Sequence, residues 1–355
     1  MRNNYKYHIA AVAGVMMMLT SCFKEDLLPQ DGGSGDFVTL DINISVPDMD
    51  QVATKAVDPD GGGVQNITLF CFDQYGLFVS TLSADVTPDG SGISLTGSFK
   101  AEVPEHVMTV HLVGNQNLSY FAEGNYTGKS EVEVMSSLQA SAGRMIYWAR
   151  KSVSELQPGT TVQLLRNQAS FSVSVEDGVN FVENGWVVMN TNAFGTVAPY
   201  DNSTGQFYAP SVDNPFVTLP EDETRLNSFY DVRLIDTEYY FETENTHENP
   251  VDVIIRGTQD SGEQLYYRVS LLDDQGEPVN VMRNHHYKIV ITGELSFGQK
   301  TFADALTASA TNNIWVSVSD EVRRVFDNER SLEVTQTYVV VGEEEFDTPN
   351  TYDLF

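Results

Sequence analysis

Apolar and polar side chains alternate along much of this chain, as they do in half-buried β-strands. Leu40, Ile42, Ile44 and Val46 alternate with polar neighbours, so one face of a strand is expected to be buried there. Residues 67–72 are apolar at almost every position and predict a strand that is covered on both faces, inside a sheet. Clusters of Gly, Pro, Asp and Asn separate such runs, which predicts turns between short strands.

The second half of the chain continues this pattern after one interruption. Residues 131–157 lose the period of two, and we expect one short helix within them. Pro158 and Gly159 then break the chain and mark a domain boundary. Further strands are expected at residues 107–113, 162–165, 171–175, 186–189, 251–255, 265–271, 287–291 and 314–318.

Many short strands between turns are typical of β-sandwiches, and a length of 355 residues suits two domains. The sequence therefore predicts an all-β chain with two β-sandwich domains in tandem, at residues 37–157 and 158–322. No repeat of fixed period is visible along the chain.

One more alternating segment follows the second predicted domain. Every second position of this stretch carries Leu332, Val334, Gln336, Tyr338 and Val340, within a C-terminal extension at residues 323–355. The strand that they predict is surplus to a closed domain. It can pair with an edge of its own domain, or it can complete a neighbouring subunit by strand addition.

The start of the chain has the features of a secretory signal peptide. A basic beginning leads into the apolar run IAAVAGVMMML, which is shorter than the about 20 residues that a membrane-spanning helix needs. The run ends in the sequence LTSC, which resembles a bacterial lipobox whose cysteine, Cys22, becomes the lipidated first residue. We therefore expect a signal peptide at residues 1–21 and a flexible tether at residues 22–36. The alternative for Cys22 is an ordinary buried cysteine after a cleaved signal.

The composition narrows the possible partners. Hydrophobic residues make up 41% of the chain, which can supply packed cores and argues against disorder over most of its length. Acidic residues outnumber basic ones by 50 to 20, for a net charge of −30, which argues against nucleic acid and against an anionic membrane face as partners. Two cysteines cannot form a disulfide framework, and Cys71 alternates with Ile67 and Leu69, so it is expected to be buried.

A search for catalytic chemistry finds no motif. The sequence lacks a Gly-x-Ser-x-Gly elbow, a His-Glu-x-x-His helix, a Walker loop and a dinucleotide fingerprint. His285 and His286 are adjacent on a predicted strand and would point to opposite faces, so they are not expected to share a metal. We therefore expect no enzyme activity, no cofactor and no metal site.

Residues 192–230 are long, irregular and rich in Asn, Pro and Tyr, and loops of this length are usually functional or mobile. Trp186, Tyr200 and Tyr208 could form a surface on which a sugar stacks. The same aromatics could equally be core and loop anchors. A glycan-binding surface lipoprotein is therefore one alternative function.

Four segments, taken together in their order and spacing, resemble a known family. They are ITLFCFDQYG at residues 67–76, LLRNQASF at 164–171, MRNHHYKI at 282–289 and IWVSV at 314–318. With the lipobox, they make the chain similar to the fimbrillin family, the type V pilins of Bacteroidales. This resemblance spans about residues 36–320.

The resemblance implies two transthyretin-like β-sandwich domains, export as an outer-membrane lipoprotein and assembly into cell-surface fimbriae. The implied partners are other fimbrial subunits, the outer membrane through the lipid on Cys22, and a ligand on a host or bacterial surface. In the family, a protease removes the first strand and another subunit's C-terminal strand fills the groove that is left. The corresponding segments here are residues 40–46 for the removed strand and 332–341 for the donor.

The expected processing site departs from the family pattern. Cleavage in the family commonly follows an arginine, but after Cys22 this chain has no arginine before Arg144. Lys55 stands where an arginine would be expected and is the candidate processing site. Either Lys55 is cut and the chain joins the fimbria by strand exchange, or the chain stays uncut and resembles the family's membrane-retained anchors.

Overall fold

Strands make up most of the chain that the structure describes. The computed structural model describes residues 36–46, 63–89, 95–141, 143–202, 204–207, 225–226, 229, 231–235, 237–259, 262–273, 276–311, 316–322, 325–326 and 331–332. Residues 37–355 form one unit, to which the description below applies. The candidate site residues that lie outside the described ranges are Cys22, Lys55, Val334, Tyr338 and Val340.

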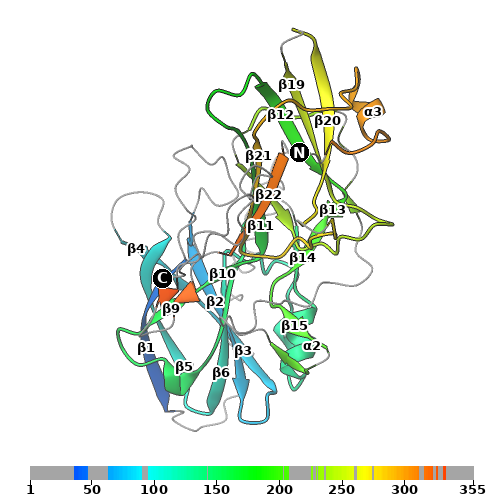
Figure 1. Cartoon of the computed structure of the whole chain (residues 1–355). Helices are drawn as coiled ribbons and strands as arrows, with labels where there is room; N and C mark the ends of the chain where they lie inside the picture. The colour runs from blue at the N-terminus through cyan, green and yellow to red at the C-terminus, as the bar shows by residue number, and fades with distance from the viewer. Residues whose placement is uncertain are drawn as a thin grey trace, which may run out of the picture. The chain divides into compact units, whose positions relative to one another are not determined.

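Two sheets formed by the first half of the chain face each other; we call them the first sheet pair (Figure 1). One sheet has the order β4-β5-β1-β9, with β1 at Phe37–Ser45, β4 at Thr87–Pro88, β5 at Thr96–Pro104 and β9 at Thr161–Gln163. The other has the order β10-β8-β6-β2-β3, with β2 at Asn66–Asp73, β3 at Phe78–Asp85, β6 at Val107–Gly114, β8 at Tyr147–Ser152 and β10 at Leu165–Arg166. Buried aliphatic side chains from both sheets form one shared core.

Two further sheets form the second sheet pair. One has the order β18-β11-β21-β22, with β11 at Gln168–Val175, β18 at Thr237–Phe241, β21 at His285–Ile291 and β22 at Val316–Val322. The other has the order β12-β19-β20, with β12 at Val182–Met189, β19 at Asp252–Thr258 and β20 at Gln264–Ser270. A second core, which includes Phe171, Trp186 and Tyr287, lies between them. The prediction of an all-β chain is confirmed in a coarser form, because the described residues are mostly β-strand with a few short helices.

The two sheet pairs share one connectivity, although the sequence shows no repeat. β1 lies between an antiparallel neighbour, β5, and a parallel neighbour, β9. β11 likewise lies between antiparallel β18 and parallel β21. In the facing sheets, β6 lies between β2 and β8 just as β19 lies between β12 and β20. β1 is therefore the topological counterpart of β11, a strand in the interior of its sheet.

β2 is buried on both faces, as its sequence predicts. Ile67, Leu69 and Cys71 point into the core of the first sheet pair, whereas Phe70 and Phe72 point into another apolar cluster. That cluster is covered by the short helix α2 (Glu131–Ser136) and by Val197 and Ala198, which follow β14 (Phe194–Thr196). β14 pairs with β7 (Gln139–Ser141). The start of the long irregular segment therefore covers the first sheet pair.

The expected short helix is α2, and its first turn explains why it forms. The hydroxyl of Ser130 accepts a hydrogen bond from the Glu133 backbone N–H, and the Glu133 carboxylate accepts one from the Ser130 backbone in return. This capping box satisfies two backbone donors at the helix start. The expected strand at residues 162–165 is instead divided between β9 and β10, which lie in different sheets.

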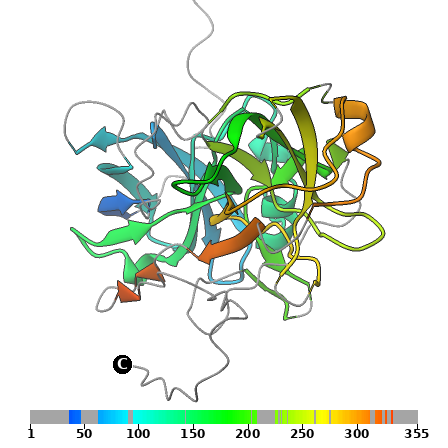
Figure 2. The same cartoon turned by 45° about the horizontal axis from the view of Figure 1, so that its top comes forward.

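The remaining elements are short. They are η2 (Glu123–Asn125), η3 (Val153–Glu155), α3 (Phe302–Ala305), β13 (Thr191–Asn192), β15 (Tyr200–Asp201), β16 (Gln206–Phe207), β17 (Arg225–Leu226), β23 (Val325–Phe326) and β24 (Ser331–Leu332). α3 packs beside β20, as Figures 1 and 2 both show. Of the surplus C-terminal strand, the structure describes only β24, which pairs with β23. None of the helices in the described ranges is long and apolar enough to cross a membrane.

Candidate functional site

The first strand, β1, is hydrogen-bonded along both of its edges. On one side it pairs antiparallel with β5 over its full length, from Phe37 opposite Pro104 to Ser45 opposite Thr96. On the other side, Asn43–Ser45 pair in parallel with β9. A strand held in this way fills a slot between two neighbours rather than lying against the outside of a sheet.

The backbone bonds of β1 are divided between its neighbours by residue parity. The Gly159 N–H donates to the Asp41 carbonyl, the Asn43 N–H donates to the Thr160 carbonyl, and the Leu164 N–H donates to the Ser45 carbonyl, each at 2.9 Å. These odd-numbered residues direct their backbone groups to the β9 side, so the even-numbered ones face β5. Without β1, both sides of the slot would present unpaired backbone groups.

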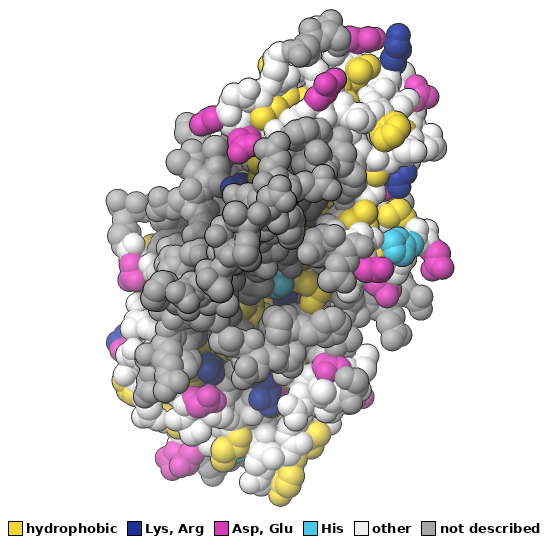
Figure 3. All heavy atoms as spheres, viewed as in Figure 1, with side chains coloured by type: hydrophobic (Ala, Val, Ile, Leu, Met, Phe, Trp, Pro, Cys, Tyr) yellow, Lys and Arg dark blue, Asp and Glu magenta, His cyan; other side chains and the backbone are white. Residues whose placement is uncertain are grey.

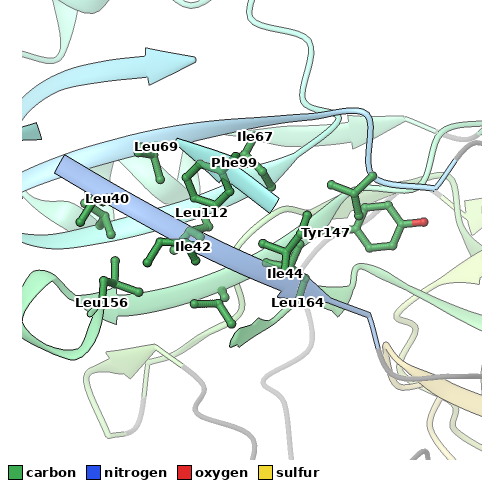
Figure 4. Packing of buried hydrophobic residues seen from close by; sticks show 14 of the residues in the cluster. Leu40, Ile42, Ile44, Ile67, Leu69, Phe99, Leu112, Tyr147, Leu156 and Leu164 are labelled. Atoms are coloured by element: carbon green, nitrogen blue, oxygen red, sulfur yellow. The ribbon is translucent and has the colours of Figure 1, made fainter. Parts of the chain in front are cut away.

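From Leu40 onwards, the even-numbered side chains of β1 point into the core of the first sheet pair (Figure 4). Val46, which directly follows β1, does the same. Leu40, Ile42, Ile44 and Val46 are 0–3% exposed. Around them lie apolar side chains that include Ile67, Leu69, Phe99, Leu112, Tyr147, Leu156 and Leu164. Burial of one such aliphatic side chain stabilises a fold by about 1.5–3 kcal/mol. β1 therefore contributes much of the core of the first sheet pair.

The outer face of β1 is largely exposed and contributes little to stability. Thr39 and Asn43 are exposed. The Asp41 carboxylate lies 2.7 Å from the Lys100 ammonium, but both side chains are largely in solvent. Exposed ion pairs of this kind stabilise by about 0–1 kcal/mol. The strand is thus retained by backbone bonds and by its four buried side chains.

The position of β1 in the chain makes it separable. It is the first strand of the unit, and the residues between Val46 and Gly63 link it to β2. One cut in this link would leave β1 attached to the unit by hydrogen bonds and packing alone. The start of β2 has its own anchor, because the Asn115 side chain donates to the Gly63 carbonyl at 2.8 Å and accepts from the Gln65 N–H at 2.9 Å.

The reactivity of Cys71 depends on whether the core that β1 covers stays closed. Its side chain is fully buried in the same cluster, and burial raises the pKa of the thiol to about 12. Because only the thiolate reacts readily, Cys71 is expected to be inert while β1 is in place.

We predict that a thiol reagent modifies Cys71 slowly in a Cys22→Ser chain, and at least about tenfold faster after Ile42→Ala, which weakens the packing of β1. With the pKa raised, the thiolate fraction should keep increasing with pH well beyond about 8.5, the ordinary thiol value. The measurement is the modification rate at several pH values. Equal rates in both chains would show that Cys71 does not sense β1.

A second group of polar side chains lies on the opposite side of the β6–β8 sheet. Trp148 Nε1 donates to His111 Nδ1 at 2.9 Å, and His111 Nε2 lies 2.5 Å from Glu131 Oε1. Glu131 is also paired with the Arg150 guanidinium, whose Nη2 lies 3.2 Å from Oε2. The Phe207 ring packs against His111 with centroids 4.7 Å apart. This arrangement ties β6, β8, α2 and β16 together.

The protonation states in this group follow from its geometry. Because Trp148 donates to Nδ1, the His111 proton is on Nε2 and faces Glu131. Burial lowers the pKa of His111, which keeps the imidazole neutral. Burial raises the pKa of Glu131, but hydrogen bonds from His111 and Arg150 outweigh it and bring the pKa to about 2. His111 is fully buried, so this group is structural.

We predict that Glu131→Gln reduces the loss of stability on acidification. The pKa of Glu131 in the fold lies below its ordinary value of 4.5, so the carboxylate stabilises the fold above about 4.5, and this stabilisation is lost as the pH falls towards about 2. The free energy of unfolding, measured across this range, should fall less steeply in the variant. The exposed Glu105→Gln is the control and should behave as the unmodified chain; an identical slope for Glu131→Gln would contradict the prediction.

Of the three aromatics proposed for sugar stacking, the structure describes Trp186 and Tyr200. Trp186 is fully buried, and its Nε1 donates to the Ile235 carbonyl at 2.8 Å. It is therefore a core residue, as the alternative interpretation had it, and its role in a glycan surface is wrong. Tyr200 is half-buried with its ring edge against Phe207. Tyr208 lies outside the described residues.

His285 and His286 lie side by side on β21, as expected. The His286 ring lies between the hydroxyl groups of Ser170, at 2.8 Å, and Ser172, at 3.0 Å. Within the ranges that the structure describes, no group of three or more His, Cys, Asp or Glu residues is placed to hold a metal ion.

Sequence reasoning missed the buried polar residues that connect the two sheet pairs. Arg283 and Glu242 form an ion pair at 2.6 Å in which both side chains are 1% exposed. Arg283 also donates to the Val197 carbonyl at 2.9 Å and to the Thr196 hydroxyl at 2.6 Å. The available signal was Arg283 just before the strand at 287–291, but nothing in the local pattern showed that this arginine is buried and therefore needs a partner.

Comparison with known proteins places this fold in a family. The model of the family described as fimbrillin-A associated anchor proteins Mfa1 and Mfa2 matches residues 36–321. The chain belongs to this family. The matched range starts one residue before β1 and ends within β22, so β1 is part of the unit that defines the Mfa family. It is a family of fimbrial structural proteins rather than of enzymes.

Individual proteins are also similar to this chain. The major fimbrium tip subunit FimE of Porphyromonas gingivalis is 25% identical over 342 residues, which cover 92% of this chain and 60% of FimE. The chain thus spans about 60% of the length of this curated relative. A solved structure of a fimbrial assembly protein from Parabacteroides distasonis has a TM-score of 0.45 and 14% identity, covering 80% of this chain and 96% of that one.

Proposed function

We propose that this chain is a subunit of cell-surface fimbriae that assembles by donor-strand exchange at the slot occupied by β1. One observation carries the proposal: β1 fills the interior of a sheet, yet a single cut between Val46 and Gly63 would leave it attached by hydrogen bonds and packing alone. An extended segment from another subunit then replaces it, with backbone bonds along both edges and alternate side chains in the core.

The remaining parts of the proposal concern the ends of the chain. Lys55 is the processing site, because it lies in the link between β1 and β2. The donor strand is the segment that contains Leu332, Val334, Tyr338 and Val340, which is offered to a neighbouring subunit. Cys22 carries the lipid that holds the unprocessed chain at the outer membrane. The two sheet pairs are transthyretin-like β-sandwich domains. Because β9 and β10 belong to the first sheet pair, the domains meet after Arg166 rather than at residue 158.

A second role within the same family is that of a membrane-retained anchor. The family description names anchor proteins, and the link before β2 contains a lysine where the fimbrillin pattern has an arginine. In an anchor, β1 stays in its slot and the lipid stays on Cys22. The two roles therefore differ in the mature N-terminus of the chain.

The test is N-terminal sequencing, with intact mass, of the chain from sheared fimbriae and from outer membranes. A start at Ala56 in the fimbrial fraction supports strand exchange after processing at Lys55. A lipidated Cys22 start in both fractions supports the anchor role. A chain lacking residues 331–355 provides the second arm: if it still joins fimbriae as the full chain does, the donor segment is not needed and that part of the proposal is wrong.

A further inference from the structure

The slot that β1 fills receives an uninterrupted row of aliphatic side chains. Its four inward positions hold Leu40, Ile42, Ile44 and Val46, and none of the four is more than 3% exposed. The cluster that receives them consists of aliphatic and aromatic side chains together with the Cys71 thiol. An amide or carboxylate at one of these positions would lose its hydrogen bonds to water and would gain none from aliphatic neighbours. Burying such a group costs free energy.

The chain's own donor segment does not present such a row. Counting from Leu332 in steps of two, the side chains are Leu332, Val334, Gln336, Tyr338, Val340 and then a glycine at position 342. A register that seats four of the residues from Leu332 to Val340 therefore places Gln336 in the slot.

The other parity offers no better match. Positions 333, 335, 337, 339 and 341 carry Glu, Thr, Thr, Val and Val, so its best register buries two threonine hydroxyls. A one-residue slip exchanges the two faces of a strand, so these two parities are the only choices. The row Leu-Ile-Ile-Val that β1 supplies is not available within residues 331–341.

We propose that the β1 slot selects a donor with four apolar side chains at alternate positions, and that it therefore takes a strand from a different subunit rather than from a second copy of this chain. The inference rests on the proposed function. It assigns the chain to positions in a fimbria where its neighbour on the slot side is another protein. The chain's own segment serves a slot that accommodates a polar residue at its centre.

A competition experiment with peptides tests this selectivity. A specific protease site is inserted after Lys55 in the full chain, the chain is cut, and a labelled peptide copy of residues 37–46 is allowed to exchange with the bound strand. Three unlabelled peptides then compete: the same copy of residues 37–46, the segment 331–341, and that segment with Gln336→Ile. Because β1 leaves only as a peptide enters, no unfolded intermediate has to be isolated.

The inference expects the β1 copy and the Gln336→Ile peptide to compete at least tenfold better than the unmodified 331–341 peptide. Equal competition by the unmodified and Gln336→Ile peptides would overturn the selectivity and leave strand exchange intact. A β1 copy that competes no better than the unmodified 331–341 peptide would also overturn it. If not even the labelled copy of residues 37–46 enters the cut chain, the proposed strand exchange itself is wrong.

Discussion

Ile42→Ala is expected to lower the free energy of unfolding by about 2–5 kcal/mol, the range found when a buried isoleucine is cut back to alanine. Ile42 is the second of the four inward residues of β1 and is fully buried. Its loss removes apolar contact with the core between the two sheets and leaves a cavity that the surrounding strands fill only in part. The large effect follows from the interior position of β1.

The measurement is denaturant unfolding of both chains, compared with Thr39→Ala on the exposed face of the same strand. Thr39 has no place in the core, so its replacement should change the free energy of unfolding by less than about 0.5 kcal/mol. If Ile42→Ala were as mild as Thr39→Ala, β1 would not be packed in the interior of the sheet, and the slot on which the proposed function depends would not exist.

Arg283→Ala is expected to cost about 3–5 kcal/mol, because it leaves the Glu242 carboxylate buried without its counter-charge. The substitution also removes the donors to the Val197 carbonyl and the Thr196 hydroxyl. Those residues belong to the segment that covers the first sheet pair. We therefore expect the contact between the two sheet pairs to loosen along with the loss of stability.

A matched exposed pair supplies the control for Arg283. Lys300 lies 3.4 Å from Glu263 with both side chains largely in solvent. Lys300→Ala should therefore change the free energy of unfolding by no more than about 1 kcal/mol. The measurement is the free energy of unfolding of the two variants by heat or denaturant. A similar loss in both would mean that burial of the Arg283–Glu242 pair has no energetic consequence.

The alternation of side chains predicted the strands whose two faces differ, and β1 is the clearest example. It failed for β8, where Tyr147 points into one core and Trp148 into another. A strand that is apolar on both faces has no period of two, so this stretch was grouped with the short helix. The division between β9 and β10 was missed because the chain changes sheets around Leu164 without a turn-forming residue.

The polar contacts between the sheet pairs could not be predicted from local pattern. Arg283, Glu242 and Thr196 are distant in the sequence, and only the fold brings them together. The shared connectivity of the two sheet pairs could not be predicted from the sequence either. Strand order depends on which positions are apolar and not on residue identity, so β1 and β11 occupy equivalent places without a sequence repeat.

The acidic charge of the chain opposes the association of its subunits. Acidic side chains lie on several of the described parts of the face in Figure 3, and the chain has a net charge of −30. Like-charged subunits repel each other, so contacts between outer surfaces alone would be weak at low ionic strength. A strand that is buried within a neighbour's core supplies an attraction that salt does not screen, which suits exchange at the β1 slot.

The central claim is that β1 must leave its slot for this chain to receive a neighbour. Asn43 and Ser98 face each other across β1 and β5, and the Asn43 N–H bonds to Thr160 on the other side, so they are a non-hydrogen-bonded pair with closely spaced backbones. Cysteines at these two positions can form a disulfide that fastens β1 to β5.

The measurement is incorporation into fimbriae of the Asn43→Cys/Ser98→Cys chain, with the disulfide formed and then reduced, beside Asn43→Cys alone. Strand exchange predicts that the disulfide-bonded chain accepts no neighbour at this slot, and that reduction restores incorporation to the level of the single variant. Equal incorporation of the oxidised and reduced chains, with the disulfide verified by mass, would contradict the claim that β1 is replaced.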